Sequence, residues 1–414
     1  MSVTNEYRDR AKRLLVLGAG PSQLGLLETA RKRGLFVIAA DRNSAAVGFP
    51  LADRRALISA EDEPALERLA TAEDIDGVIA PGIDWSVALA ARISAKLGLP
   101  HPLSVESAQL AVAKLRQREL FVQAGLPHTR YSVATRGEEA ETAARELGFP
   151  LVVKAPDRQG QRGMALARRH EELAPAVEMA LAESRSGLCL IEKLEPGVEV
   201  TVIGFSLDAH FHTIAVTERK RDEREAFGVT LEHRLPSSLN QAEVEQAASV
   251  AEQAAALLGI EQGPTYTQLI VGRQGARLGE RAARLGGGHD AELCAAALGI
   301  DLNELALDAA LGEPIDPRRL EPRARVSAAC TRFLVSPPGR LIAVHGAANA
   351  AAAPGVQFVR IFREPGHEIR PLRSRSDRAG AVLALAPTRE QAVSRAELAA
   401  DLVRFEVAGS VSPS

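Results

Sequence analysis

The stretch RLGERAARLGGGHDAEL, residues 277–293, sets three arginines and several acids around a triple glycine, directly ahead of a helical pattern. Glycine clusters and surface charge are both typical of a solvated turn between a strand and a helix, and this interpretation stays open for the stretch alone. The alternative is a phosphate and metal site, because glycine lets a ligand approach the backbone and a helix N-terminus attracts anions. The rest of the chain must decide between the two.

The composition is typical of a soluble globular protein, with 414 residues, 46% apolar and 25% charged side chains, and a net charge of −3. This length allows two or three domains, each with its own core. The interspersed charges and the 4% aromatic content argue against a nucleic-acid partner. The three cysteines lie singly in apolar runs, which predicts buried thiols rather than a disulfide framework or a zinc site. With no signal-peptide pattern and no spanning segment, we expect a cytoplasmic protein without membrane contact.

The first hundred residues alternate between strand and helix patterns. Apolar runs at 13–17, 35–41 and 76–82 read as strands with amphipathic helices after the first and third. This order predicts a parallel sheet with right-handed crossovers. The glycines of the first turn, GAGPSQLG at 18–25, lack the G-x-G-x-x-G spacing of dinucleotide sites, so a tight turn or a small anion is the better interpretation.

The middle of the chain changes to hairpin patterns. LVVKAP (151–156) and MALARR (164–169) predict a hairpin around a glycine-bearing loop, and from residue 197 onward longer antiparallel strands are expected. The charged run ERKRDERE, 218–225, predicts a solvated loop, with Arg219 or Lys220 contacting a carboxylate or phosphate as the alternative.

Three patterns in this region carry chemistry. Lys154 ends a buried strand beside the 157–163 loop, which favours an anion site over a snorkelling edge lysine. IEKLEPGVEVTV, 191–202, is either a polar hinge or a slot for adenosine. Gln268 and Glu280 end two adjacent strands and, when opposed across a hairpin, can share a cation.

Together these segments resemble the ATP-grasp superfamily from about residue 105 to 299. The resemblance rests on Lys114 opening a helix, on FPLVVK with its glycine loop, on IEKLEPGVEVTV, and on GERAARLGGGHDAELCAAALGIDL, in that order. It implies an α/β and α+β chain with the ATP-grasp fold. The expected domains are a Rossmann-like N-terminal domain, an ATP-grasp small lobe, a large antiparallel lobe and a C-terminal α+β module, at 1–103, 104–187, 188–324 and 325–414.

The resemblance implies ATP as the nucleotide and assigns its binding to residues in all four segments: Lys114, Lys154, Gly160, Gly163, Glu192, Lys193, Leu194, Glu199, Gln268 and Glu280. The two lysines would meet the phosphates beneath the 157–163 loop. Backbone groups at 192–194 would frame the adenine, and Glu199 would hold the ribose.

The resemblance also implies the remaining roles. Arg284, Lys154 and Arg162 would be catalytic, with Arg284 stabilising the transferred phosphoryl group. Glu280 and Gln268 would ligate one or two Mg²⁺ ions, for which Mn²⁺ can substitute. The substrate would lie against Gly286, Gly287, Gly288 and His289. These roles agree with phosphoryl-transfer chemistry, which depends on positioning and charge neutralisation.

Two positions depart from the superfamily pattern. Gln268 stands where a glutamate is usual, and Ala282 stands where an asparagine is usual. The site would therefore hold its metals less tightly, hold one rather than two, or recruit Asp290 or Glu292. A degenerate site without activity is a further alternative, although the lysines, Glu280 and the adenosine strand argue against it.

Within the superfamily, the chain resembles carboxylate–amine ligases of the L-amino-acid ligase and carbamoyl-phosphate-synthase-like kind, through RLGGGHDAEL, ALGEP, PPGRLIAVHG and DRAGAVLALAPTREQA. This implies an ATP-dependent, ADP-forming ligase that makes an amide or peptide bond through an acyl phosphate, with small-molecule carboxylate and amine partners and a homodimeric assembly. The alternatives are a carboxylase of the biotin-carboxylase-like or purine-pathway type, which His233 and Arg234 keep open, and a nucleotide-binding protein with a degenerate metal site.

Overall fold

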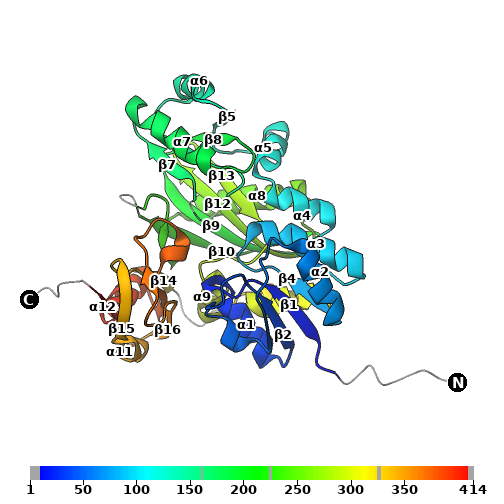
Figure 1. Cartoon of the computed structure of the whole chain (residues 1–414). Coiled ribbons are helices and arrows are strands. Elements are labelled where there is room, and N and C mark those ends of the chain that lie inside the picture. The colour runs from blue at the N-terminus through cyan, green and yellow to red at the C-terminus, as the bar shows by residue number, and fades with distance from the viewer. Residues whose placement is uncertain (1–9, 159, 161, 223–225, 324–327, 409–414) are drawn as a thin grey trace, which may run out of the picture.

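The computed structural model describes residues 10–158, 160, 162–222, 226–323 and 328–408. Within those residues, helices and strands alternate in a mixed α/β arrangement whose strands form four sheets. Figure 1 shows a small sheet with α6 and α7 at the top, a large sheet through the middle, the N-terminal parallel sheet below it and the C-terminal segment at the lower left. No helix in the described ranges is both long and apolar enough to cross a membrane.

The N-terminal sheet has the order β3-β2-β1-β4, and its strands are parallel as predicted. Its strands are β1 (Arg13–Leu17), β2 (Phe36–Ala40), β3 (Arg54–Ala56) and β4 (Gly77–Ile79), and its helices are α1 (Leu24–Lys32), α2 (Glu63–Ala72) and α3 (Asp84–Leu97). Asp41 accepts hydrogen bonds from the backbone N–H groups of Ala19 and Asn43 at 2.9 Å each, so it stabilises the first turn. The prediction omitted β3 and α2.

The small-lobe sheet has the order β5-β8-β6-β7 and is antiparallel throughout. Its strands are β5 (Tyr131–Ala134), β6 (Leu151–Lys154), β7 (Met164–Ala167) and β8 (Cys189–Lys193), and it packs against α6 (Gly137–Leu147) and α7 (Leu173–Glu183). The β6–β7 hairpin confirms the prediction for 151–169. Because the inward-facing residues of β6 are fully buried, the strand fixes Lys154 at its end.

The large sheet has eight antiparallel strands in the order β13-β12-β9-β10-β11-β14-β18-β16. They are β9 (Val198–Leu207), β10 (His210–Arg221), β11 (Thr230–Leu235), β12 (Gly263–Gly272), β13 (Gly275–Ala282), β14 (Ala328–Leu334), β16 (Val356–Ile361) and β18 (Gly380–Ala386). Helix α8 (Gln241–Leu257) begins at a capping box on Asn240 and packs its alanine face on this sheet. The sheet continues past the expected 324/325 boundary, which itself falls outside the described residues.

The remaining elements surround these sheets. They are α4 (Val105–Val112), α5 (Lys114–Gln123), α9 (Asp290–Leu298), α10 (Leu302–Ala310), α11 (Ala347–Ala351), α12 (Arg389–Asp401), and a third sheet of β15 (Gly339–His345), β17 (Glu368–Ile369) and β19 (Arg404–Val407). Five short 3₁₀ helices occur in the described ranges, at Pro21–Gln23, Phe49–Leu51, His170–Glu172, Pro317–Leu320 and Arg375–Asp377. The three cysteines are free and buried, as predicted.

One local prediction is wrong. The run 218–225 was expected to be a solvated loop, but β10 extends to Arg221, and the side chain of Arg219 is only 10% exposed. The alternative left open, contact of Arg219 with a carboxylate, agrees with the 3.9 Å between its Nη1 and Glu199 Oε2. Alternating burial along a strand places Arg219 inward although its sequence neighbours are charged. Residues 223–225 lie outside the described residues.

Candidate active site

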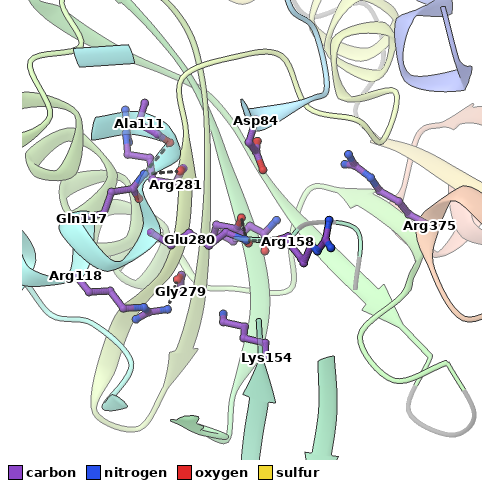
Figure 2. A network of polar contacts seen from close by, with 12 residues as sticks. Asp84, Ala111, Gln117, Arg118, Lys154, Arg158, Gly279, Glu280, Arg281 and Arg375 are labelled. Carbon is purple, nitrogen blue, oxygen red and sulfur yellow. Dashed lines mark hydrogen bonds and ion pairs between the residues drawn. The ribbon is translucent and has the colours of Figure 1, made fainter. Parts of the chain in front are cut away.

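A cavity lies where the small lobe, the large sheet, the N-terminal domain and the 3₁₀ helix Arg375–Asp377 meet; it is called the main cavity below. Figure 2 shows Asp84, Lys154, Glu280 and Arg375 around one space. The sequence-predicted residues that line it are Lys114, Lys154, Gly160, Arg162, Glu192, Lys193, Leu194, Glu199, Gln268, Glu280, Arg284, Gly287 and Gly288. The structure therefore brings together residues that are up to 174 positions apart in the chain, from 114 to 288.

Lys154 belongs to a buried triad on the floor of the small lobe. Its Nζ lies 2.7 Å from Glu192 Oε2, and the other carboxylate oxygen of Glu192 accepts a hydrogen bond from Arg118. Arg118 also donates to the carbonyl of Gly279 at 2.8 Å, which ties α5 to β13 (Figure 2). Burial lowers the pKa of Lys154 although Glu192 raises it. Glu192 therefore balances two cations, only one of which reaches the cavity.

Lys114 and Glu280 form an ion pair in the lining of the main cavity. Lys114 Nζ donates to the carbonyl of Arg158 at 2.6 Å and lies 3.3 Å from Glu280 Oε1. Burial alone would raise the pKa of Glu280, but Lys114, Lys154 and Arg284 outweigh burial and lower that pKa to about 2. Glu280 is therefore an anion at every physiological pH, surrounded by cations suited to phosphate.

Arg284 is positioned by the N-terminal domain. Its Nε and Nη2 lie 2.8 Å and 2.6 Å from Asp84 Oδ1, at the first residue of α3, and Tyr266 lies beneath the guanidinium at 5.2 Å. Burial alone would lower the pKa of Arg284, but Asp84 outweighs burial and raises it. The guanidinium therefore stays charged and is held in one orientation.

The predicted adenosine slot has a different backbone arrangement from the one expected. The N–H groups of Lys193 and Leu194 donate to the carbonyls of Arg130 and Pro150, so neither amide is free for a base. Lys193 Nζ donates to two further backbone carbonyls, at 2.7 and 3.0 Å. Both amides are therefore used within the small lobe, and contact of the remaining backbone groups at 192–194 with adenine stays a prediction. Glu199, which also lines the cavity, is paired with Arg221.

Gln268 and Glu280 are directly opposed across the β12–β13 hairpin, as predicted, but Gln268 already has a partner. Its Oε1 accepts a hydrogen bond from Arg219 Nη1 at 2.8 Å. Ala282 is buried, and its methyl side chain has no atom that can ligate a metal. Neither position offers a free oxygen comparable to the carboxylate of Glu280.

Asp290 and Glu292, suggested as replacement metal ligands, do not line the main cavity. Asp290 Oδ1 lies 3.1 Å from His233 Nδ1, and burial lowers the pKa of His233 to about 4. Glu292 pairs with Arg360 and lies 3.0 Å from His289 Nδ1. Both carboxylates serve the packing of α9, so the suggestion that they join the metal site is not supported by their positions.

The triple glycine lets other side chains of the protein approach its backbone closely, and two of its residues also line the main cavity. A Cβ at Gly287 would lie 2.9 Å from Arg375 Nη1 and 3.1 Å from Ser22 Oγ, whose hydroxyl donates to the Gly287 carbonyl. A Cβ at Gly288 would overlap His233. A Cβ at Gly286 would overlap Asp290, and Gly286 is not among the residues that line the cavity. Of the three glycines expected to contact substrate, Gly287 and Gly288 line the main cavity.

Two further predicted residues lie outside the lining of the main cavity. Gly163 packs against Glu183 of α7, outside the cavity lining. His289 has a left-handed backbone, φ 61°, and lies among Phe333, Phe358 and Phe362. It lines a second cavity on the N-terminal side, together with the first glycine turn and Trp85.

Sequence reasoning missed two arginines that line both cavities. Arg375 Nη2 donates to the carbonyl of Gly82 at 2.9 Å, and Arg378 lies 3.6 Å above the Phe333 ring. Burial lowers the pKa of Arg378 to about 9. Neither has a carboxylate partner within 4.0 Å among the described residues. The segment that contains both arginines, LRSRSDR at 372–378, has the pattern of a polar surface loop, so the sequence did not predict that they line a cavity.

Two family models match the chain. The model for the ATP-binding domain of the carbamoyl-phosphate synthase large chain matches residues 114–318, and the model for L-amino acid ligase C-terminal domain 2 matches residues 332–408. Together the two models match the cavity-lining residues of the small lobe, the large sheet and the C-terminal segment. Asp84, from the N-terminal domain, lies outside both matches.

Relatives match over much of the chain. The uncharacterized protein y4rH of Sinorhizobium fredii is 29% identical over 335 residues, 78% of this chain and 67% of that protein. A formate-dependent phosphoribosylglycinamide formyltransferase of Synechococcus is 27% identical over 418 residues, covering 96% and 98% of the two chains. The L-amino acid ligase of Bacillus licheniformis has the same fold, with a TM-score of 0.80, 20% identity and 96% and 99% coverage.

Proposed function

Because the chain belongs to the ATP-grasp superfamily of ATP-dependent ligases, we propose that it joins a small-molecule carboxylate to an amine, forming ADP and phosphate. The observation that best supports this proposal is that Lys114, Lys154 and Arg284 surround Glu280 inside one cavity. Three cations around a single partly buried carboxylate match a nucleoside triphosphate with its metal.

The residues present fit one divalent cation. No group of three or more His, Cys, Asp or Glu side chains suited to a metal occurs among the described residues. Magnesium, however, is commonly held by one or two carboxylates together with substrate phosphates. Glu280 would hold Mg²⁺ in this way, and the ion would supply charge neutralisation at the phosphates.

The reaction follows from what the remaining groups can do. A carboxylate oxygen attacks the γ-phosphorus of ATP, the bond to the β-phosphate oxygen breaks, and ADP leaves. The amine then attacks the acyl carbon, loses a proton and displaces phosphate. Arg284 and Lys154 stabilise the charge on the transferred group, and the glycine loop near Gly160 and Arg162 excludes water from the acyl phosphate.

The second cavity is where the acyl acceptor would enter. Arg162, Gly287, Arg375 and Arg378 line both cavities, so the two spaces adjoin. Four arginines line the second cavity, Arg42, Arg162, Arg375 and Arg378, and none of them has a carboxylate within 4.0 Å among the described residues. With the aromatic wall they favour an anionic substrate with apolar surface.

A second candidate is transfer of a one-carbon acid. It is favoured by the formyltransferase relative, which matches nearly the whole chain. In that case formate or bicarbonate would take the place of the larger carboxylate, while the nucleotide site would be unchanged.

The test is ADP formation by purified protein with Mg-ATP. The substrates are pooled amino acids and amines, then formate or bicarbonate with the same amines. ADP and phosphate that depend on an acid and an amine together support the ligase, and dependence on formate or bicarbonate supports the second candidate. AMP formation would overturn the acyl-phosphate route, and failure to bind Mg-ATP would overturn both.

The ATP site is expected to lose affinity at alkaline pH before an ordinary lysine would. Lys154 has a pKa below its usual value of 10.5 because burial disfavours the ammonium. Below that pKa the charge attracts phosphate, and above it the attraction is lost, so kcat/KM for ATP should fall as pH rises through it. Lys154→Arg should move this fall to higher pH. A fall that stays at the same pH in the variant would mean that another group controls it.

A further inference from the structure

Carboxylates around the main cavity are almost all balanced by cations of the protein itself. Glu192 pairs with Arg118 and Lys154, and Glu199 pairs with Arg221. Glu280 lies at the centre with Lys114 at 3.3 Å. A second divalent cation would therefore need oxygen ligands from the paired strands β12 and β13, where Gln268 lies in the middle of β12 and Ala282 ends β13.

Arg219 lies beside Gln268 of β12. Its Nη1 donates to Gln268 Oε1 at 2.8 Å and its Nη2 donates to Thr230 Oγ1 at 2.6 Å. Its Nη1 also lies 3.9 Å from Glu199 Oε2, and its Nε is buried without a hydrogen-bond partner among the described residues. Arg219 lines the main cavity, and each of its Nη atoms carries a second N–H that these two hydrogen bonds leave unused.

This geometry disfavours a cation at Gln268. A guanidinium can only donate hydrogen bonds, so it fixes the amide oxygen of Gln268 toward itself. The other polar atom of that amide is an –NH₂ donor, which cannot ligate a metal. The methyl group of Ala282 offers no ligand, and the positive charge of Arg219 repels any cation placed within a few ångströms.

We propose that Arg219 supplies, from the protein itself, the positive charge of a second divalent cation, so that the chain binds its nucleotide with one metal ion. This inference rests on the proposed ATP site. Arg219 keeps its charge because Tyr266, Glu199 and Glu280 raise its pKa although burial lowers it. A fixed guanidinium with free donors contacts phosphate oxygens directly, as a metal would.

The test counts metal ions. Mn²⁺ is titrated into the full chain with the ATP analogue AMP-PNP, and bound Mn²⁺ is followed by electron paramagnetic resonance while calorimetry measures AMP-PNP binding. The wild type should bind one Mn²⁺ per AMP-PNP, without the spin coupling of a metal pair. Two coupled Mn²⁺ ions in the wild type would overturn the inference, whereas absent AMP-PNP binding would overturn the proposed function.

Variants separate the charge of Arg219 from a merely structural role. Arg219→Met should weaken AMP-PNP binding roughly tenfold or more, as expected for loss of a charge-assisted hydrogen bond. The double variant Arg219→Met/Gln268→Glu should gain a second, coupled Mn²⁺. The control is Arg273→Met, an exposed arginine at the turn of the same hairpin, which should change neither quantity. A double variant that binds AMP-PNP but still only one Mn²⁺ would count against the inference.

Discussion

Replacing Arg284 with methionine is expected to lower kcat for ADP formation by about 10²–10³-fold, the usual cost of removing one preorganised donor to developing charge. The effect should fall mainly on kcat, because Lys114 and Lys154 remain to bind the nucleotide. The physical reason is orientation. Asp84 holds the guanidinium through two nitrogens at 2.6 and 2.8 Å, so its donors need little rearrangement when the phosphoryl group moves.

Two further variants make this prediction specific. Arg284→Lys keeps the charge but not the planar fork and should recover only part of kcat. Asp84→Asn removes the carboxylate that positions the guanidinium and should also lower kcat, with a smaller change in KM for ATP. The matched control Arg273→Met should be indistinguishable from wild type. The measurement is steady-state ADP release once an acid–amine pair has been found. An Arg284→Met variant that binds ATP and keeps wild-type kcat would contradict the assignment.

The elements that sequence could predict are those whose pattern is local. The buried runs of β1 and β6 and the β6–β7 hairpin need only a few consecutive residues to be recognised, and all three occur as expected. The short strand β3 has a polar pattern, RRA, and was therefore missed. The strand β11 was also missed, because its buried Glu232 and His233 look like surface residues without their partners in the folded chain.

The site could be predicted as a set of residues but not as a network. Lys114, Lys154 and Glu280 sit in recognisable segments, and the fold brings them to one cavity. The partners that determine their charge states come from far along the chain. Arg284 finds Asp84 two hundred residues earlier. No periodicity records such a pairing, because it depends on how the N-terminal domain packs against the large sheet.

The same limit explains Arg219. In sequence it belongs to a run of alternating charges, which is the pattern of a solvated loop. In the fold it is an inward position of β10, beside Gln268 of a strand two places away in the sheet. The departure at Gln268 was visible in the sequence. The sequence also offered Arg219 as a contact for a carboxylate or phosphate, but its pairing with Gln268 could not be predicted, because only the sheet order brings the two side chains together.

Replacing Glu192 with glutamine is expected to destabilise the protein by about 3–5 kcal/mol, because it leaves two buried cations without their shared counter-charge. The side chains of Arg118, Glu192 and Lys154 are only 5%, 8% and 16% exposed, so water cannot replace the lost carboxylate. Each carboxylate oxygen meets one cation, and a neutral amide can serve at most one of them. The measurement is urea unfolding without nucleotide, followed by a probe of the small lobe.

A double-mutant cycle tests whether charge causes the loss. Arg118→Met in the Glu192→Gln background removes one uncompensated cation, so the double variant should recover part of the lost stability. The control is Glu171→Gln in the same lobe, which is 75% exposed and whose partner Arg169 is 72% exposed and 3.6 Å away, and it should cost less than about 1 kcal/mol. Equal losses for Glu192→Gln and Glu171→Gln would show that the triad is not what stabilises this lobe. A larger loss at Glu192 that Arg118→Met partly reverses would show that the charge balance among Arg118, Glu192 and Lys154 stabilises the small lobe.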